Sequence, residues 1–307
     1  MDARRHPLLG SRALMSDARF PWPAPSEGGS PPVWTGRGFE LDGARVPVMS
    51  YGVGESGWSD GLTSMHEDVA GATHPIDLAS RRHAVEQLRK HLTRPDAVVL
   101  EVGCSSGYLL RDMRAALPDA FLIGADYVRG PLVTLADALP TVPILQFDLQ
   151  KCPLPAASVD AVVLLNVLEH IEDDAAAVGH LFRILKPGGV AVIEIPAGPQ
   201  LYDVYDKELM HFRRYRRKGA VALFEKAGFR VEKASHLGFF VYPGFWAVKK
   251  KNRLFASKEA GAAVVAKDIK SSASPVLASL MNLELKLGEK MSFPVGIRCL
   301  VTARKPA

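Results

Sequence analysis

The sequence predicts an α/β fold: a doubly wound, mostly parallel sheet of seven strands, with an N-terminal helical cap and an insertion before the last strand. Short apolar runs alternate with helix-like segments, which favours parallel strands joined by right-handed crossovers. Two runs, Val159–Leu165 and Val190–Ile195, are almost continuously apolar, as expected for strands buried on both faces. Hydrophobic residues make up 48% of the 307 residues, which is enough for a sizeable core.

The chain before the predicted sheet divides into two parts. Residues 1–45 are rich in Pro, Gly, Ser and Arg without a hydrophobic period, so we expect a disordered tail, in which translation starts at Met1 or Met15. Residues 46–92 are expected to form an N-terminal helical lid. Its last part repeats Ala84, Leu88 and Leu92 on one face of a helix.

Residues 93–244 are expected to form the α/β core. Each strand is predicted from a short apolar run, and each helix from amphipathic spacing with a Gly or Pro stop signal. The predicted strands are Val98–Glu101, Ala120–Ala125, Pro143–Phe147, Val159–Leu165, Val190–Ile195 and Phe229–Leu237. The predicted helices are Tyr108–Leu117, Pro131–Leu139, Asp173–Leu185 and Lys218–Ala227, and Lys186–Gly189 is predicted to be a turn.

Residues 245–292 are predicted to be a helical insertion, and residues 293–307 contain the final strand, Val295–Ala303. The insertion is lysine-rich at first and then carries an apolar stripe at helical spacing, formed by Leu277, Leu280, Leu283 and Leu287. Such stripes usually bury against protein, so a wall of the substrate pocket or a homodimer face is favoured over a membrane surface.

Charge and cysteine usage restrict the class of protein. The net charge is +5, which suits an anionic ligand as well as it suits ordinary solubility. The three cysteines, Cys104, Cys152 and Cys299, are too few and too widely spaced for a disulfide framework or a structural zinc site. No apolar window is long enough to span a bilayer, and no secretory signal is recognisable. We therefore expect a cytoplasmic protein.

The segment E-V-G-C-S-S-G, residues 101–107, follows the first core strand and precedes the first core helix. Glycine at Gly103 and Gly107 lets the backbone approach a ligand closely. A dinucleotide fingerprint would need further glycines at the positions of Ser105 and Tyr108, so a nicotinamide or nucleotide-sugar enzyme is the less favoured alternative.

Polar residues follow four successive strands. They are Glu101 with Gly103, then Asp126, Asp148 and Asn166. Ligands of doubly wound sheets bind at the carboxyl ends of the strands. A single Asp after a strand is more often a turn former, but four such residues in step with the glycine turn indicate a binding site.

These motifs resemble those of class I S-adenosylmethionine (SAM)-dependent methyltransferases, which have a Rossmann-like fold. Ser105 stands where that family usually has a middle glycine. The segments V-D-A-V-V-L-L-N-V-L-E-H-I and L-F-R-I-L-K-P-G-G-V extend the resemblance, which covers residues 76–303. It implies SAM as cofactor, with S-adenosylhomocysteine (SAH) as product. The cofactor-binding residues that it implies are Glu101, Gly103, Cys104, Gly107, Asp126, Tyr127, Asp148, Leu149, Asn166 and Val167.

The implied reaction is in-line transfer of a methyl group to an O or N atom of a small molecule. The sequence offers two candidate bases, His211 in a D-x-x-x-x-H-x-R-R-Y segment and, as the second choice, His170. Arg213, Arg214 and Tyr215 are expected to bind a substrate that is anionic or contains a sugar, although an ion-pair cluster at a helix start explains them about as well. His66, from the lid, is a further candidate for substrate contact. No metal site is expected.

Two other functions stay open. Nucleic-acid methylation is disfavoured, because the basic charge is modest and scattered and no N-P-P-Y-like tetrad follows the fourth strand. A SAM-binding regulatory or partner module would bind the cofactor without turnover, and the same fold can carry it.

Overall fold

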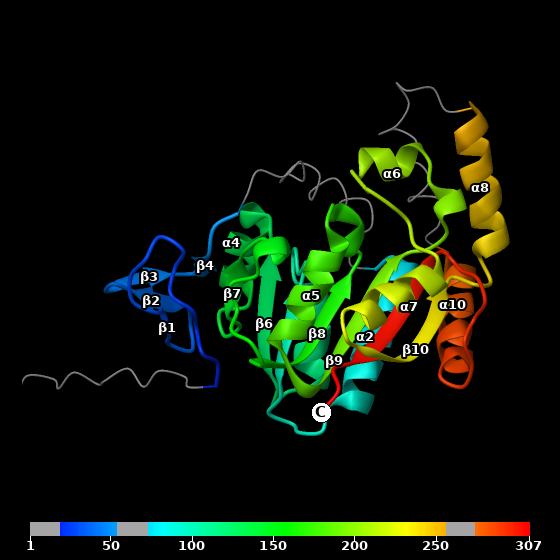
Figure 1. The fold of residues 1–307 in the computed structure, drawn as a ribbon. Helices are drawn as coiled ribbons and strands as arrows, with labels where there is room; N and C mark the ends of the chain where they lie inside the picture. Colours follow the sequence, from blue (N-terminus) through cyan, green and yellow to red (C-terminus); the bar gives the residue numbers. More distant parts are fainter. Residues whose placement is uncertain (1–18, 54–72, 256–273) are drawn as a thin grey trace, which may run out of the picture.

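Eight strands form one sheet in the order β10-β11-β9-β8-β5-β6-β7-β4 (Figure 1). The computed structural model describes residues 19–53, 73–255 and 274–307. The strands of this sheet are β4 (Val48–Ser50), β5 (Val98–Val102), β6 (Phe121–Asp126), β7 (Ile144–Gln146), β8 (Val159–Leu165), β9 (Leu185–Pro196), β10 (Arg230–Leu237) and β11 (Arg298–Arg304).

The sheet is mostly parallel, as predicted. Strands β4 to β9 pair in parallel, whereas β11 is inserted between β9 and β10 and is antiparallel to both. The seven predicted strands correspond to β5–β11, and β4 is an eighth strand at the edge beside β7. The strand order reverses direction between β5 and β8, which creates the switch point where ligands of such sheets bind.

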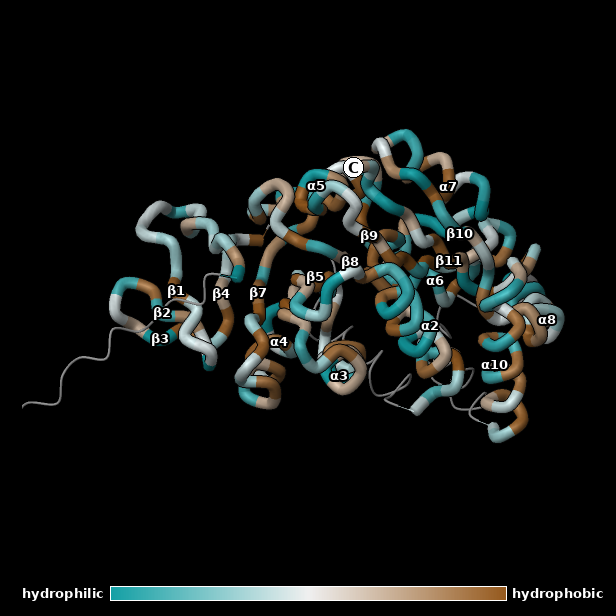
Figure 2. Tube along the Cα trace, turned by 90° about the horizontal axis from the view of Figure 1, so that it is seen from below, coloured by the Kyte–Doolittle hydropathy of each residue, from teal (hydrophilic) through white to brown (hydrophobic). Residues whose placement is uncertain are grey.

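Helices cover both faces of the sheet (Figure 2). One face carries α5 (Asp174–Ile184) and α7 (Arg217–Lys226), and the other carries α2 (Pro75–His91), α3 (Tyr108–Ala116) and α4 (Arg129–Ala138). Each layer has its own group of buried apolar side chains, so the sheet is buried on both sides and its central strands are almost entirely apolar.

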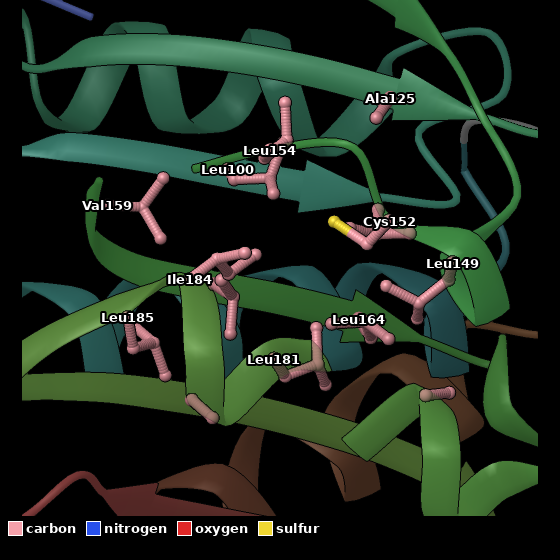
Figure 3. Close-up of a cluster of buried hydrophobic side chains, with 14 of the residues drawn as sticks. Leu100, Ala125, Leu149, Cys152, Leu154, Val159, Leu164, Leu181, Ile184 and Leu185 are labelled. Atoms are coloured by element: carbon pink, nitrogen blue, oxygen red, sulfur yellow. The ribbon is translucent and has the colours of Figure 1, made fainter. Parts of the chain in front are cut away.

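Helix α5 shows how these layers pack. Its side chains Leu181 and Ile184 point toward the sheet, where they lie among Leu100, Val159 and Leu164 (Figure 3). All five side chains are completely buried. Close packing of this kind fixes the strand ends on which the site is built.

The N-terminal segment differs from the predicted tail. From residue 19 onward it is folded, with a three-stranded sheet of β1 (Val33–Trp34), β2 (Phe39–Leu41) and β3 (Ala44–Val46), and with β4 in the main sheet. Aromatic side chains hold it: the Trp22 ring lies 4.9 Å from that of Phe39 and 6.3 Å from that of Phe121. Residues 48–50, expected in the helical lid, are therefore strand, while residues 1–18 and 54–72 lie outside the described part of the chain.

Strand β9 also begins earlier than predicted. The segment Lys186–Gly189 was expected to be a turn, but β9 runs through it from Leu185. Gly188 donates its N–H to the carbonyl of Lys305 at 2.9 Å, and Lys305 donates its N–H to the carbonyl of Gly189 at 2.9 Å. The chain after β11 thus gives this Pro-Gly-Gly segment an extended partner.

The insertion contributes two helices, α8 (Tyr242–Phe255) and α10 (Pro275–Gly288), with residues 256–273 outside the described ranges. On α10, Leu277 and Met281 are buried, whereas Leu283 and Leu287 are exposed. A homodimer face on this region stays a prediction. Among the described residues, no helix is both long and apolar enough to cross a membrane.

Candidate active site

A cavity of about 720 Å³ opens at the carboxyl ends of the parallel strands. Its floor is formed by the residues that follow β5, β6, β7, β8 and β9, and its walls include α6 (Val204–Glu208), α8 and α10. Helices α6 and α8 lie above this edge of the sheet (Figure 1). The volume falls within the range of about 300–1,000 Å³ that is typical of small-molecule sites.

The glycine turn after β5 requires glycine for steric reasons. Gly103 has a φ of 82°, and a Cβ atom there would lie 2.3 Å from Cγ2 of Val167. Gly107, with a φ of 74°, starts α3, and a Cβ atom there would lie 2.3 Å from Cδ1 of Leu135. Ser105, in place of the middle glycine, adopts a left-handed φ of 43°. The turn thus holds a left-handed residue at this position although the residue is not glycine.

Two strand-end aspartates both shape a turn and line the cavity. Asp126 accepts hydrogen bonds from the N–H groups of Ser105 at 2.9 Å and Val128 at 3.0 Å. Asp148 accepts one from the N–H of Gln150 at 2.9 Å and caps η1 (Leu149–Lys151). The turn-former explanation and the ligand-contact explanation thus apply to the same residues, because a carboxylate has lone pairs left for a ligand.

Asn166 follows β8 in a left-handed conformation, with a φ of 55°. Its side chain donates a hydrogen bond to Oε1 of Glu194 at 3.2 Å. This bond links the ends of β8 and β9 at the cavity floor.

The structure brings most of the predicted cofactor residues to one cavity and leaves three outside its lining. Those that line it are Gly103, Asp126, Tyr127, Asp148, Leu149, Asn166 and Val167. Glu101, Cys104 and Gly107 do not line it; Glu101 and Cys104 are buried within the core beside the turn. Burial and the nearby Asp126 raise the pKa of Glu101 well above its ordinary value. The part that these three residues play in cofactor binding therefore stays a prediction.

Asp206 of α6 is completely buried and connects the polar groups of the upper wall. Its Oδ1 accepts hydrogen bonds from Nδ1 of His211 at 2.8 Å and from Nε of Arg214 at 2.6 Å. Nζ of Lys249 lies 3.7 Å from its Oδ2 and pairs with Asp203 at 2.7 Å. Burial opposes ionisation, but His211, Arg214 and Lys249 together hold the pKa of Asp206 well below its usual range.

The two candidate bases lie side by side in the cavity wall. The rings of His170 and His211 are 4.7 Å apart between centroids, at an angle of 73°. Because Nδ1 of His211 donates to the Asp206 carboxylate, its Nε2 carries a lone pair. Burial also lowers the pKa of His211, which favours the neutral imidazole. His211 thus has the form that a general base requires.

The structure places the residues predicted to bind substrate in different surroundings. Arg214 lines the cavity, but Arg213 and Tyr215 do not. Arg213 pairs with Asp174 at 2.8 Å, and the Tyr215 hydroxyl donates to the same carboxylate at 2.8 Å. These two residues form the ion-pair and hydrogen-bond cluster that was the alternative explanation. His66 lies outside the described residues.

Sequence reasoning missed several residues of the cavity, among them Arg298 and Glu169. Arg298, at the start of β11, pairs with Asp77 and with Glu194, both at 2.5 Å. The start of an antiparallel strand lies at the same edge as the ends of its parallel neighbours, so a charged residue there was a usable signal. Glu169 is completely buried, and burial raises its pKa to about 8.

A family model described as a methyltransferase domain matches residues 78–234, about half of the chain. The chain belongs to the class I SAM-dependent methyltransferase family. It is 36% identical over 157 residues to a "probable S-adenosylmethionine-dependent methyltransferase" of Mycolicibacterium smegmatis, an alignment covering 50% of this chain and 59% of that protein. It is 32% identical over 131 residues to a trans-aconitate 2-methyltransferase of Azoarcus sp., covering 42% of this chain and 50% of that enzyme. The chain therefore spans about half the length of these curated relatives.

Solved structures with low sequence identity share the fold of this methyltransferase-family chain. Haemonchus contortus phosphoethanolamine N-methyltransferase 2, solved with SAM, aligns with a TM-score of 0.53 at 15% identity, over 80% of this chain and 57% of that one. The [4+2]-cyclase SpnF aligns with a TM-score of 0.50 at 17% identity, over 74% and 81%. Since one of these neighbours is a cyclase, the fold by itself does not define the reaction.

Proposed function

We propose that this chain transfers the methyl group of SAM to an O or N atom of a small-molecule acceptor. One observation carries the proposal: a single cavity joins the glycine turn and the strand-end polar residues to the Asp206–His211 pair. The first group of residues suits an adenosyl cofactor. The second suits removal of a proton from an acceptor.

The cofactor-facing residues divide along the floor of the cavity. Asp126 would accept hydrogen bonds from the ribose hydroxyls, as a carboxylate at the end of a second strand can. Asp148 and Leu149 would lie on the adenine side. Asn166 and Val167 would lie near the methionine end. Val167 packs so closely against Gly103 that a Cβ atom at Gly103 would clash with it.

Methyl transfer from SAM depends more on the alignment of the acceptor than on catalytic functional groups. SAM supplies an already activated methyl group, so the cavity must hold the acceptor in line with it and exclude water. The acceptor atom forms a bond to the methyl carbon, the carbon–sulfur bond breaks, and its electron pair stays on sulfur. Nε2 of His211 would take the proton of an acceptor hydroxyl or ammonium group, with His170 as the second candidate.

The charges of the cavity favour a neutral acceptor such as a sugar hydroxyl over an anion. Arg214, Lys249 and Arg298 line the cavity, and each is already paired with a carboxylate. An anionic acceptor would have to compete with these carboxylates. Arg213, which was expected to bind substrate, pairs with Asp174 instead.

Calorimetric titration of the full chain with SAM, SAH and NAD tests the cofactor. We expect micromolar binding of SAM and SAH and none of NAD; binding of NAD alone would overturn the assignment. The SAM-loaded protein is then incubated with acceptors bearing hydroxyls, amines or carboxylates, and SAH is measured. Tight SAM binding with no SAH formed on any acceptor would instead support a regulatory module.

A further inference from the structure

Three side chains of the cavity wall form a cluster whose members can all bind a metal ion. Glu169, His170 and His211 line the cavity, and one ligand atom from each lies within 4.8 Å of the others. Glu169 is completely buried, and neither of its carboxylate oxygens has a hydrogen-bond partner among the described residues. A buried carboxyl group without a partner costs free energy, so its position requires an explanation.

The backbone fixes this cluster from two directions. Glu169 and His170 lie in η2 (Leu168–His170), directly after β8 and Asn166. Phe212 donates its N–H to the carbonyl of Glu169 at 2.8 Å, and the hydroxyl of Tyr202 donates to the carbonyl of His211 at 2.7 Å. The cluster is therefore part of the folded scaffold and does not depend on flexible surface side chains.

The Asp206–His211 hydrogen bond orients His211 as a ligand. The proton of the imidazole lies on Nδ1, toward Asp206, and the lone pair on Nε2. Metal-binding histidines almost always donate their other ring N–H to a carboxylate or carbonyl group in this way. Arg214 and Lys249 keep that carboxylate charged.

We propose that Glu169, His170 and His211 bind a divalent transition-metal ion in this cavity, contrary to the expectation from the sequence. Glu169 and His211 are buried, and a cation between the Glu169 carboxylate and the two imidazole rings would stabilise the charged form of that carboxyl group. Two histidines and one carboxylate are the ligands of Mn²⁺, Fe²⁺, Co²⁺ or Zn²⁺, whereas Mg²⁺ and Ca²⁺ prefer oxygen ligands alone. Three protein ligands leave further coordination positions for a molecule in the cavity.

The consequence for the reaction rests on the proposed function. A bound cation would hold an acceptor oxygen and lower the pKa of its hydroxyl group, so that the proton leaves to water before the methyl group is transferred. In that state His211 is a metal ligand, and it is the base only when the cation is absent.

The metal site is tested by titrating the EDTA-treated full chain, without a histidine tag, with Co²⁺. We expect one equivalent to bind, with visible absorption bands of protein-bound Co²⁺, and metal analysis after dialysis to give the same ratio. Glu169→Gln keeps the size of the side chain and removes its charge, and His170→Gln removes a second ligand. Each should weaken Co²⁺ binding by at least about tenfold, the lower bound for loss of a supporting group at a metal site.

The matched control is Glu172→Gln, which removes the same charge three residues away at an exposed position and should bind Co²⁺ like the unmodified chain. SAH affinity, measured on every variant, reports on the cofactor site separately from the metal. Failure of the unmodified chain to bind Co²⁺, or equal binding by all variants, would overturn the metal site even if SAH binds. Absence of SAH binding with intact Co²⁺ binding would instead overturn the proposed function.

Discussion

A single carboxylate at the end of β6 takes part in a turn and also lines the cavity. Asp126 accepts hydrogen bonds from two backbone N–H groups, one in the glycine turn and one at the start of α4. It also lines the cavity. Its oxygens thus fix the shape of the turn and place negative charge where ribose hydroxyls would lie.

We expect Asp126→Asn to weaken SAH binding by about tenfold or more. The amide loses one acceptor oxygen and the charge, and a hydrogen bond to a charged group contributes about 1.5–3 kcal/mol. Calorimetric titration measures the change, and Asp137→Asn, at an exposed position of α4, is the control. An unchanged dissociation constant would show that Asp126 has only the turn-forming task.

His211 leads to a second prediction at this scale. For the metal-free protein, we expect His211→Gln to lower turnover by a factor of about 10²–10⁴, the usual contribution of a general base, and to leave SAH affinity unchanged. His91→Gln, at the end of α2, is the control, because His91 pairs with Glu232 and does not line the cavity. Full turnover of His211→Gln would remove this residue from the reaction.

At the scale of helices and strands, an ion pair joins two elements that are far apart in the sequence. Helix α2 and strand β11 meet through Asp77 and Arg298, whose side chains pair at 2.5 Å. Burial alone would raise the pKa of Asp77, but Arg298 and then His74 hold it below its ordinary value of 3.8. A carboxyl group with a lowered pKa stabilises the fold above its unfolded pKa, and this contribution is lost as the pH falls through the folded pKa.

We therefore expect Asp77→Asn to reduce the free energy of unfolding at pH 7 by about 1.5–3 kcal/mol. The difference from the unmodified chain should shrink as the pH falls below about 4, where the carboxyl groups of the unfolded chain are protonated. Urea unfolding at several pH values measures it. The exposed pair of Arg94 with Asp96 provides the control Asp96→Asn, which should cost less than about 1 kcal/mol. Equal losses in the two variants at pH 7 would contradict this role of the pair.

Helices and strands could be predicted from the sequence where their own residues determine the conformation. The run Val159–Leu165 became β8 without change, because a strand buried on both faces must be apolar in itself. The short strands β1–β4 were missed, because two- and three-residue strands show no period, and their order depends on distant side chains such as Phe121. The start of β9 was missed because its partner, Lys305, is far away in the sequence.

At the scale of the whole molecule, the N-terminal segment packs at the β7 edge of the sheet. Phe20, Trp22 and Phe39 belong to the same buried cluster as the side chains of α5 and α7, and β4 pairs with the outer edge of β7. The segment thus extends the core and covers a strand edge that would otherwise be open to association with other chains.

Trp22→Ala should lower the free energy of unfolding by about 3–5 kcal/mol, as expected for an aromatic side chain removed from a core. Denaturant unfolding followed by circular dichroism measures the loss. Trp246→Ala, at a position that is 42% exposed on α8, is the matched control and should cost far less. Similar losses for the two tryptophans would contradict the packing of the N-terminal segment.

The site residues that directly follow parallel strands were the ones best predicted from the sequence. Asp126, Asp148 and Asn166 were found because a rule connects strand ends to ligands. Glu169 was not found, because its lack of hydrogen-bond partners is a property of the folded environment and has no pattern in the sequence. Arg213 was misplaced because a basic run at a helix start can face either the cavity or a neighbouring acidic residue.

The position of β11 in the sheet has a consequence for synthesis on the ribosome. Arg298 lies 221 residues after Asp77, and β11 must enter between β9 and β10, both of which are translated earlier. A nascent chain can therefore complete β4 to β9 while the cavity still lacks one wall and β9 has an open edge. Contacts between residues so distant in sequence form slowly, so we expect the edge of β9 to stay unpaired on the nascent chain until β11 has been translated.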